Sequence, residues 1–572
     1  MLHWLWTYWK VIVPTKSTAE LDAEHWLFVL TLDGLTYFPF HCVLFNRWWL
    51  LFFCALANVA AGSIIAFYSL YDILDVYFYG SQTKQSFTIG LQAYIWLGVA
   101  AALAGPVVER EGPRTGLTMA TLLVTVGYVL SQLAVSATNP TFLLIGYGFF
   151  CGGGFGIVLV TTMCAVQKWF PDFRGFVSGV CMCGFGLGNT AFSLLYAKAL
   201  NRGGLLDPVT DVSHVPQIFW STGFAIVAVL VVTTFVIRTP PPTYIVNGHD
   251  IHCVPEAKVI DATLLDDEYL KVGMTLVNYD IVAHTELDGT DVQYFQQVKA
   301  LSLLQCIFST DFLFLYVAFA ASIIPAQIFT SELAAICLGV FKQSMDTTNQ
   351  LMTQGFASNT IGRLVVPLFS DALIRIFYTN PAFARKIIFV VLLITQVVFM
   401  AIASNATAMS FSMFRTLVLT TVFASGGNLA LVPCFITDMF GVYHAGTMYG
   451  LALSCWSIRS VVAGYGFASF QVTRSSLGIQ FQWMLVLLVV GFVAALFIRT
   501  NSSDRFFHGY QYSIGGRVIC QFAFARPTSD TYAIEDVEDS VTILDRHNPS
   551  STPSTEDFVL WKGDGAAGDK QV

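Results

Sequence analysis

Long apolar segments, separated by short polar loops, dominate the chain from residue 48 onward. They cover about residues 48–72, 88–108, 115–136, 141–166, 175–198, 216–237, 308–331, 348–370, 386–404, 410–438, 445–470 and 480–498. A helix needs about 20 residues to cross a hydrocarbon core, and it satisfies its own backbone there. The segments are too long and too uniformly apolar for barrel strands. The pattern therefore predicts an all-α membrane protein with twelve transmembrane helices.

The segments fall into two sets of six, which predicts two bundles. We expect residues 46–238 to form an N-terminal six-helix bundle and residues 304–499 a C-terminal one. Residues 239–303 are polar and acidic and read as a linker, and 500–572 as a disordered acidic tail. The aromatic block at 26–45 is interrupted by Asp33 and Pro39, so residues 1–45 are predicted to lie at the membrane interface rather than to span.

The two halves also resemble each other in sequence. Gly152-Gly-Gly154 in the fourth segment corresponds to Gly426-Gly427 in the tenth, and the loop from Phe170 to Gly179 corresponds to the loop from Phe440 to Gly450. Parallel six-helix repeats with the substrate held between them are an architecture of transporters.

Composition supports this interpretation and narrows the function. Hydrophobic residues make up 55% of the chain and charged residues only 12%, about half the fraction in soluble proteins. The net charge of −8 arises in the polar segments, and no basic patch suggests nucleic acid. The 12 cysteines include no CxxC pair, so neither a zinc site nor a disulfide framework is indicated. We find no nucleotide loop, metal cluster or catalytic constellation, and expect neither an enzyme nor a cofactor.

Lysine and arginine set the predicted orientation. One set of loops, with Arg47, Arg238 and Arg499 at the ends of the two halves, carries ten of these residues, and the opposite set carries five. The positive-inside rule then places both termini and the linker in the cytosol. The sequence leaves open whether the membrane is the plasma membrane or that of an organelle.

The segment Gly105-Pro-Val-Val-Glu-Arg-Glu-Gly-Pro-Arg114 fits the pattern G-x-x-x-[D/E]-R-x-G-x-R. It resembles the signature loop of the major facilitator superfamily, which implies two six-helix bundles that alternate access to a central site. Glu109 and Arg110 are expected to form charge contacts that hold the cytosolic side shut in one conformation and release it in the other. The predicted gating residues are Gly105, Glu109, Arg110, Gly112, Arg114 and Asp371.

A short charged patch, Lys168-Trp-Phe-Pro-Asp-Phe-Arg-Gly175, follows the fourth segment. Asp172 is predicted to stabilise the start of the next helix. The form K-W-F-P-x-x-R-G-x-x-S-G, with Asp438-Met-Phe-Gly441 in the second half, resembles the oxalate/formate antiporter, monocarboxylate transporter and nodulin-like branch. This resemblance indicates the branch but not the substrate.

Two arginines inside apolar segments are the principal substrate candidates. Arg363 lies about 12 Å deeper than Asp371 by helix rise, and Arg459 lies near mid-membrane. An arginine there costs about 2.5–3.5 kcal/mol on insertion scales, and neither has an acid at i±3 or i±4. A pair of unpaired guanidiniums favours a carboxylate, which arginine grips with two parallel hydrogen bonds. The alternative is structural, with pairing to backbone carbonyls or to an acid on another helix.

The resemblance adds roles for their neighbours. Monocarboxylate transporters carry a substrate arginine matching Arg363, with an acid four residues earlier, where this chain has Asn359. This leaves coupling to a proton or to a counter-anion open. In the oxalate/formate branch a cationic residue serves the substrate at the position of Trp456, one turn from Arg459. Further candidates are Tyr68, Gln92 and Gln327, each of which could instead bond one helix to another.

The resulting prediction is a monomeric secondary active or facilitative transporter, embedded in a lipid bilayer, of a small organic anion and first of all a monocarboxylate. Two alternatives remain open. The chain could carry a neutral or cationic solute with both arginines structural, or it could be a non-transporting sensor or scaffold that signals through its linker and tail.

Overall fold

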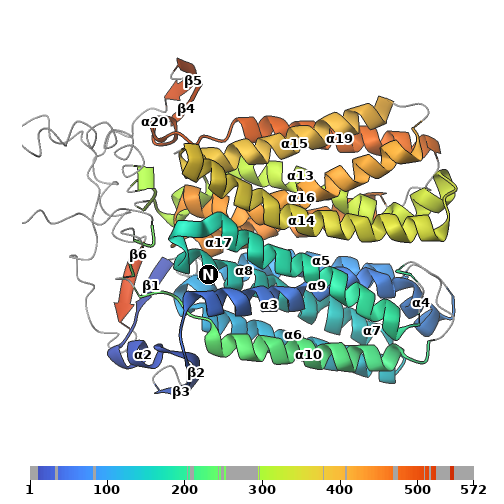
Figure 1. Ribbon diagram of the computed structural model, residues 1–572, viewed down its shortest axis with the longest axis horizontal. Helices are drawn as coiled ribbons and strands as arrows, with labels where there is room; N and C mark the ends of the chain where they lie inside the picture. The colour runs from blue at the N-terminus through green and yellow to red at the C-terminus, as the bar shows by residue number, and fades with distance from the viewer. Residues whose placement is uncertain are drawn as a thin grey trace, which may run out of the picture.

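The computed structural model describes residues 11–32, 36–81, 85–201, 204–205, 212–241, 244–246, 250–252, 294–295, 297–299, 301–377, 379–405, 409–467, 474–507, 509–514, 517–523 and 541–545. Two groups of long, roughly parallel helices lie side by side, and the strands, which include the first and last described elements, gather at one end of them (Figure 1). We call this the terminal end.

The first bundle consists of six helical spans. The first span is α3 (Arg47–Ala66), a 3-10 turn and α4 (Tyr71–Tyr79); α5 (Gln85–Glu111) and α6 (Pro113–Ser136) follow. The fourth span runs from α7 (Pro140–Leu143) through a π-helical turn into α8 (Gly152–Trp169), and α9 (Arg174–Ala199) and α10 (Val215–Val236) complete the set.

The second bundle repeats this arrangement after the short helix α12 (Leu303–Ile307). Its spans are α13 (Thr310–Ala334) with a π-helical extension, α14 (Met345–Phe377), α15 (Pro381–Asn405), α16 (Phe411–Phe440), the pair α17 (Ala445–Leu453) and α18 (Cys455–Ser460), and α19 (Arg474–Leu496). The prediction of twelve spans in two bundles is confirmed. Within the described ranges, ten helical segments are long and apolar enough to cross a membrane, and the polar α14 and the broken α17–α18 complete the set.

Local sequence signals explain where several of these helices begin. Asn46, Ser309 and Ser410 stand at the N-caps of α3, α13 and α16, where each side chain accepts a hydrogen bond from a backbone N–H of the first turn. Gly112 separates α5 from α6 with a φ of 87°, a conformation that glycine adopts without strain, and Pro113 then starts α6.

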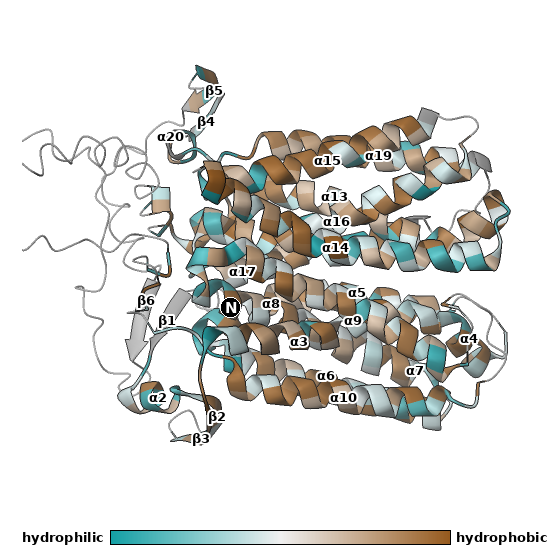
Figure 2. Cartoon of the chain, viewed as in Figure 1, coloured by the Kyte–Doolittle hydropathy of each residue, from teal (hydrophilic) through white to brown (hydrophobic). Residues whose placement is uncertain are grey.

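The outer surface of both bundles is apolar (Figure 2). Large hydrophobic side chains remain exposed along the outward faces of the peripheral helices, among them Leu122 and Val129 on α6, Trp220 and Phe224 on α10, and Trp483 and Val486 on α19. Such a continuous apolar surface is stable only in contact with lipid. The protein is therefore a multi-pass membrane protein.

Residues 26–45 do not form a spanning helix. They fold into an antiparallel hairpin of β2 (Trp26–Leu32) and β3 (Thr36–Leu44), preceded by β1 (Val11–Thr15) and α2 (Thr18–Ala23). The two strands, of 7 and 9 residues, form backbone hydrogen bonds with each other instead of forming a helix. The block therefore does not cross the membrane as a single helical segment.

The expectation of a disordered tail is wrong for part of it. Helix α20 (Ser502–Arg505) is followed by a hairpin of β4 (Gly509–Ile514) and β5 (Arg517–Ala523), and β6 (Val541–Asp545) pairs with β1. The hairpin is held because Tyr510 and Tyr512 donate hydrogen bonds to the backbone oxygens of Phe497 and Leu496 at the end of α19. Most of the linker lies outside the described residues.

Close backbone contacts hold the first bundle together. A Cβ placed on Gly188 of α9 would overlap the backbone oxygen of Val59 on α3, so the two helices approach more closely than any side chain would permit. Gly62 of α3 meets the oxygen of Phe185 on α9 in the same way. The pair α3–α9 is therefore packed backbone to backbone.

Gly188→Ala is expected to destabilise the protein, because overpacking a tight contact costs about 1–3 kcal/mol. The measurement is the thermal unfolding midpoint of the purified protein in detergent. Gly355→Ala is the matched control, since a Cβ at that position in α14 meets open space, and its midpoint should stay unchanged. Equal midpoints for the two variants would contradict this packing.

Candidate functional site

A small cavity of about 50 Å³ lies between the two bundles, and it has room for a few water molecules. Residues from both halves line it: Ile65, Asn189, Ile323, Ala326, Gln327, Thr330, Phe356, Asn359, Arg363, Val422, Ser425, Leu429, Trp456 and Arg459. The wall thus combines apolar residues with a few amide, hydroxyl and guanidinium groups, the composition expected of a site for a small polar ligand.

Arg363 reaches the cavity from α14, and its side chain is buried, with 3% exposed. Its Nε donates to Asn359 Oδ1 at 2.8 Å, its Nη1 donates to the backbone oxygen of Met182 at 3.3 Å, and the guanidinium lies 5.1 Å from the centre of the Phe185 ring. Asn359 is itself oriented, because its Nδ2 donates to the backbone oxygen of Val422. Neutral groups therefore hold the guanidinium in position without cancelling its charge.

Arg459 reaches the same cavity from α18. Its Nη2 donates to Gln327 Oε1, and the guanidinium lies 4.3 Å from the centre of the Trp456 ring and 5.7 Å from that of Tyr94. Trp456 also lines the cavity, and its Nε1 has no hydrogen-bond partner in the described part of the chain. The cavity therefore has an uncommitted buried donor beside its second cation.

Neither guanidinium forms an ion pair with a carboxylate of the described residues. Both guanidiniums line the same cavity, so an anion bound there would be attracted by both positive charges. A buried charge without a counter-charge is costly, and an anion in the cavity would relieve both.

Five of the predicted substrate residues line this cavity, and two do not. Arg363, Arg459, Asn359, Trp456 and Gln327 come together there. Tyr68 lies behind the wall, with its ring 5.8 Å from that of Phe356, and Gln92 packs toward Gly148 of the fourth span. Tyr68 lies in the 3-10 turn that interrupts the first span, and such a turn has about 3.0 residues per turn instead of about 3.6.

The sequence analysis did not single out Thr330 and Ser425. Thr330 lies three residues after Gln327 on α13, and therefore on the same helix face, a spacing that could have indicated it.

At the terminal end, Glu109 bridges the two bundles. Its carboxylate pairs with Lys168 of α8 and accepts a hydrogen bond at 2.7 Å from the backbone N–H of Gly446, in the first turn of α17. Nearby, a Cβ on Gly105 would meet the backbone of Thr447 at 2.6 Å. The end of α5 is therefore joined to the start of α17 by a buried carboxylate and by close backbone packing.

Asp371 makes the same connection in the opposite direction. From α14 it accepts hydrogen bonds from the backbone N–H groups of Gly175, at 3.1 Å, and Phe176, at 2.6 Å, at the start of α9. It also pairs with Arg385 at 2.6 Å. Since α14 is the second span of its bundle and α9 the fifth of the other, the contact is the counterpart of that between Glu109 and α17.

A third carboxylate, Asp438 at the end of α16, completes the closure. It pairs with Arg174 of α9 at 2.7 Å and with Arg385 of α15 at 3.2 Å. All three side chains are almost entirely buried, so water and salt screen these ion pairs only weakly.

Arg110 and Asp172 have partners that the sequence did not indicate. Glu109 makes a charge contact, with Lys168, whereas Arg110 lies 3.4 Å from Glu111 at the surface. Asp172 pairs with Arg47 of α3 at 2.9 Å, so the carboxylate that caps α9 is Asp371 from the other bundle.

Arg114 does not bridge the bundles either; it pairs with Glu24 of the N-terminal segment at 3.2 Å and donates to the backbone oxygen of Ile237.

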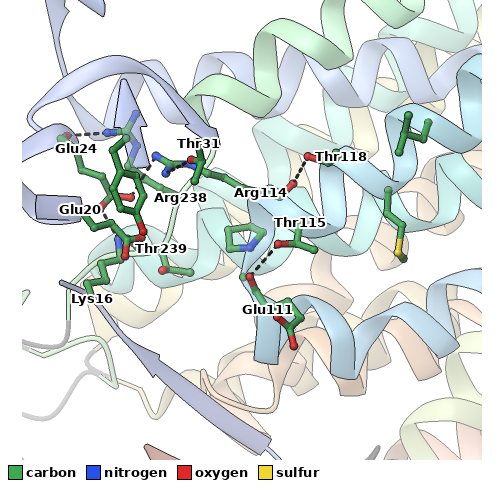
Figure 3. Close-up of a pocket in the computed structure, with 15 residues that line it drawn as sticks. Lys16, Glu20, Glu24, Thr31, Glu111, Arg114, Thr115, Thr118, Arg238 and Thr239 are labelled. Carbon is green, nitrogen blue, oxygen red and sulfur yellow. Dashed lines mark hydrogen bonds and ion pairs between the residues drawn. The ribbon is translucent and has the colours of Figure 1, made fainter. Parts of the chain in front are cut away.

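A larger cavity of about 390 Å³ surrounds Arg114 at the terminal end (Figure 3). It is formed by the N-terminal segment, the start of α6 and the end of α10, not by the interface between the bundles. Lys16 and Arg114 both pair with Glu24, and Arg238 donates to the backbone oxygens of Glu24, Trp26 and Leu27. Burial, and then Arg114, lower the pKa of Arg238 to about 9, so it remains charged near neutral pH. These contacts attach the N-terminal segment to the first bundle.

Comparison with known proteins decides the family. The sequence pattern described as Major Facilitator Superfamily matches residues 49–464. The chain belongs to the major facilitator superfamily. Proteins of this superfamily are generally carriers rather than enzymes, and their fold accounts for the two bundles.

Individual relatives resemble the chain at low identity. The oxalate:formate antiporter of Oxalobacter formigenes is 23% identical over 458 residues, which are 79% of this chain and 91% of the antiporter. Monocarboxylate transporter 13 of Bos taurus is 29% identical over 101 residues, 17% of this chain and 23% of that transporter. The solved structure of the proton:xylose symporter XylE bound to 6-bromo-6-deoxy-D-glucose superimposes with a TM-score of 0.55 at 13% identity, covering 79% of this chain and 95% of that one. This likeness concerns the fold alone.

Asp371→Asn is expected to loosen the terminal end of this major facilitator. It leaves Arg385 with one carboxylate fewer, and each weakened charged hydrogen bond contributes about 1.5–3 kcal/mol. The measurement is the alkylation rate of Cys164, which is buried beside Glu109 and does not touch Asp371. The rate should rise. The control is Asp346→Asn in the exposed first turn of the same helix. Equal rates in the two variants would contradict the role of Asp371 in holding this end closed.

Proposed function

We propose that the protein transports a small organic anion, first of all a monocarboxylate, by alternating access. The observation that carries the proposal is the pair of buried guanidiniums, Arg363 and Arg459, facing one cavity without a carboxylate partner among the described residues. A substrate carboxylate would accept two parallel hydrogen bonds from one of them and feel the charge of both. The Trp456 indole N–H supplies a third donor in the same wall.

The dimensions of the cavity favour a small substrate. About 50 Å³ is bounded by Phe356, Trp456 and Ile323, and a bulky solute would not fit in this conformation. This size is consistent with the oxalate:formate antiporter, whose name gives a two-carbon and a one-carbon acid.

Alternating access would use the terminal end as one gate. Glu109, Asp371 and Asp438 hold it shut in this conformation, and rocking of the bundles about the cavity would separate each carboxylate from the helix start or cation of the other bundle. We propose further that this end faces the cytosol, because ten lysines and arginines gather on its loops against five on the opposite side. The cavity is built within one chain, so a monomer suffices.

A second candidate is a neutral polar solute. The hydrogen-bond partners of the two arginines, Asn359 and Gln327, are neutral and favour this candidate. With these partners, both guanidiniums could have a purely structural role. The two proposals differ in what happens when the positive charge is removed.

Arg363→Gln is expected to abolish anion uptake into liposomes reconstituted with the purified protein. Losing one partner of a buried charged pair costs about 2–5 kcal/mol, which raises the Kd about 30-fold or more. Uptake of labelled formate, oxalate, pyruvate and lactate is measured, together with thermal stabilisation by the same acids.

Arg415→Gln is the matched control for this charge removal, because Arg415 lies on α16 of the same bundle, exposed and away from the cavity. Its uptake should stay normal. Anion uptake that survives Arg363→Gln, or uptake of an uncharged solute by both variants, would favour the second candidate.

Exchange against an internal anion is expected to drive uptake more strongly than a proton gradient. The position that could carry a proton holds Asn359, an amide whose oxygen and nitrogen are both engaged and which does not titrate near neutral pH. Liposomes preloaded with the same anion are compared with empty liposomes under an imposed pH gradient. Uptake that follows the gradient and ignores the preloaded anion would contradict this coupling.

A further inference from the structure

Two β-hairpins flank the membrane-spanning helices at the terminal end, one on each bundle. The hairpin β2–β3 comes directly before the first span, and β4–β5 follows the last span after α20. In Figure 1 they project on opposite sides of the molecule, β2–β3 below α10 and β4–β5 above α15 and α19. The superfamily fold of two bundles does not by itself require either one.

Each hairpin is attached to its own bundle. On the first bundle, Arg238 at the end of α10 donates to the backbone oxygens of Trp26, at 2.9 Å, and Leu27. On the second, Tyr512 donates to the backbone oxygen of Leu496 at 2.7 Å, and Lys386 of α15 donates to that same oxygen at 2.9 Å. Each hairpin would therefore move with the bundle that carries it.

Both hairpins expose large apolar side chains. In β3, Phe38 is 54% exposed, Phe40 51% and Leu44 65%; in β5, Ile519 and Phe522 are each 63% exposed. The four strands contain a single charged residue, Arg517. Two uncharged, aromatic-rich surfaces of this kind are unfavourable in water and typical of the level of lipid headgroups.

The exposed surfaces continue into the lipid-facing walls. Leu44 ends β3 three residues before α3, whose first turns expose Trp48, Trp49 and Phe52 by 47%, 45% and 53%. On the other bundle the β4–β5 hairpin lies against the end of α19, where Val493 and Phe497 are exposed by 44% and 41%. A bilayer that covers the helices would reach both hairpins without a break.

We propose that both hairpins insert their apolar side chains into the interface of the bilayer and act as paired anchors. The partner is a lipid surface, recognised through aromatic and aliphatic side chains rather than through a headgroup charge. Because each anchor is fixed to one bundle, it sets the depth of that bundle at its outer edge. Rocking then turns each bundle about its anchor. The inference is independent of the transported solute.

The experiment places a bimane fluorophore on Cys42 of β3, which is exposed, or on Cys520 of β5, which is partly exposed. In each full-length protein, Cys183, Cys253 and the other hairpin cysteine are replaced by serine. Quenching is measured in nanodiscs, once with phospholipid spin-labelled near its headgroup and once with iodide in the water. The control position is Asp22→Cys, an exposed residue of α2, and in Figure 1 this helix lies farther from the spans than the β2–β3 hairpin does.

The expected result is strong quenching by the spin-labelled lipid and weak quenching by iodide at both hairpins, and the reverse at residue 22. The double variant Phe38→Ser, Phe40→Ser should exchange this pattern at Cys42 alone, with an unchanged unfolding midpoint in detergent because both rings are exposed.

Iodide quenching at either hairpin would overturn the proposal of paired anchors. Protection from both quenchers, with cross-linking between two copies through Cys42 or Cys520, would also overturn it, since the surface would then belong to a protein interface.

Discussion

The closed terminal end depends on one kind of contact, a buried carboxylate on one bundle that accepts hydrogen bonds from the first backbone N–H groups of a helix on the other. Glu109 does this for α17, and Asp371 does it for α9. The first N–H groups of a helix have no partner within the helix and carry part of its positive dipole end, so a carboxylate is their best acceptor. Because the halves are repeats, the same contact is made twice with the roles exchanged.

This contact also accounts for the buried cations around it. Glu109 and Asp371 are removed from water, which is unfavourable unless each also has a positive partner, and Lys168 and Arg385 provide one. Separation of the bundles would return these groups to water together. The closed state is thus stabilised by groups that water would solvate if the bundles separated, which is compatible with the alternating access proposed above.

Much of the fold could be read from the sequence, because the constraint imposed by lipid is local. A run of apolar residues identifies a span wherever it lies. The cost of placing an arginine in the membrane indicated that Arg363 and Arg459 face a protein cavity, and in the structure both line one. The hairpin at 26–45 was not predicted as strands, because its uniformly apolar residues lack the alternation that identifies a half-buried strand.

The partners of individual charged residues were harder to predict, because they lie far apart in the sequence and meet only in the folded protein. Asp172 stands two residues before Arg174 and was the obvious cap for α9, whereas the cap is Asp371, 195 residues from Phe176. Likewise, the partner of Glu109 is Lys168, 59 residues away on a neighbouring helix. For Tyr68, the 3-10 turn that carries it cannot be recognised from its composition.

A glycine provides a backbone donor in each of the two carboxylate contacts that close the terminal end. The N–H groups of Gly446 and Gly175 reach their acceptors because neither residue has a side chain: a Cβ on Gly446 would collide with the Glu109 carboxylate, and a Cβ on Gly175 with the Asp371 carboxylate. Each contact therefore needs two residue types, an acid on one bundle and a glycine in the first turn of the facing helix. Two transporters with little sequence similarity can therefore close in the same way if they keep the acid, its cation and the facing glycine.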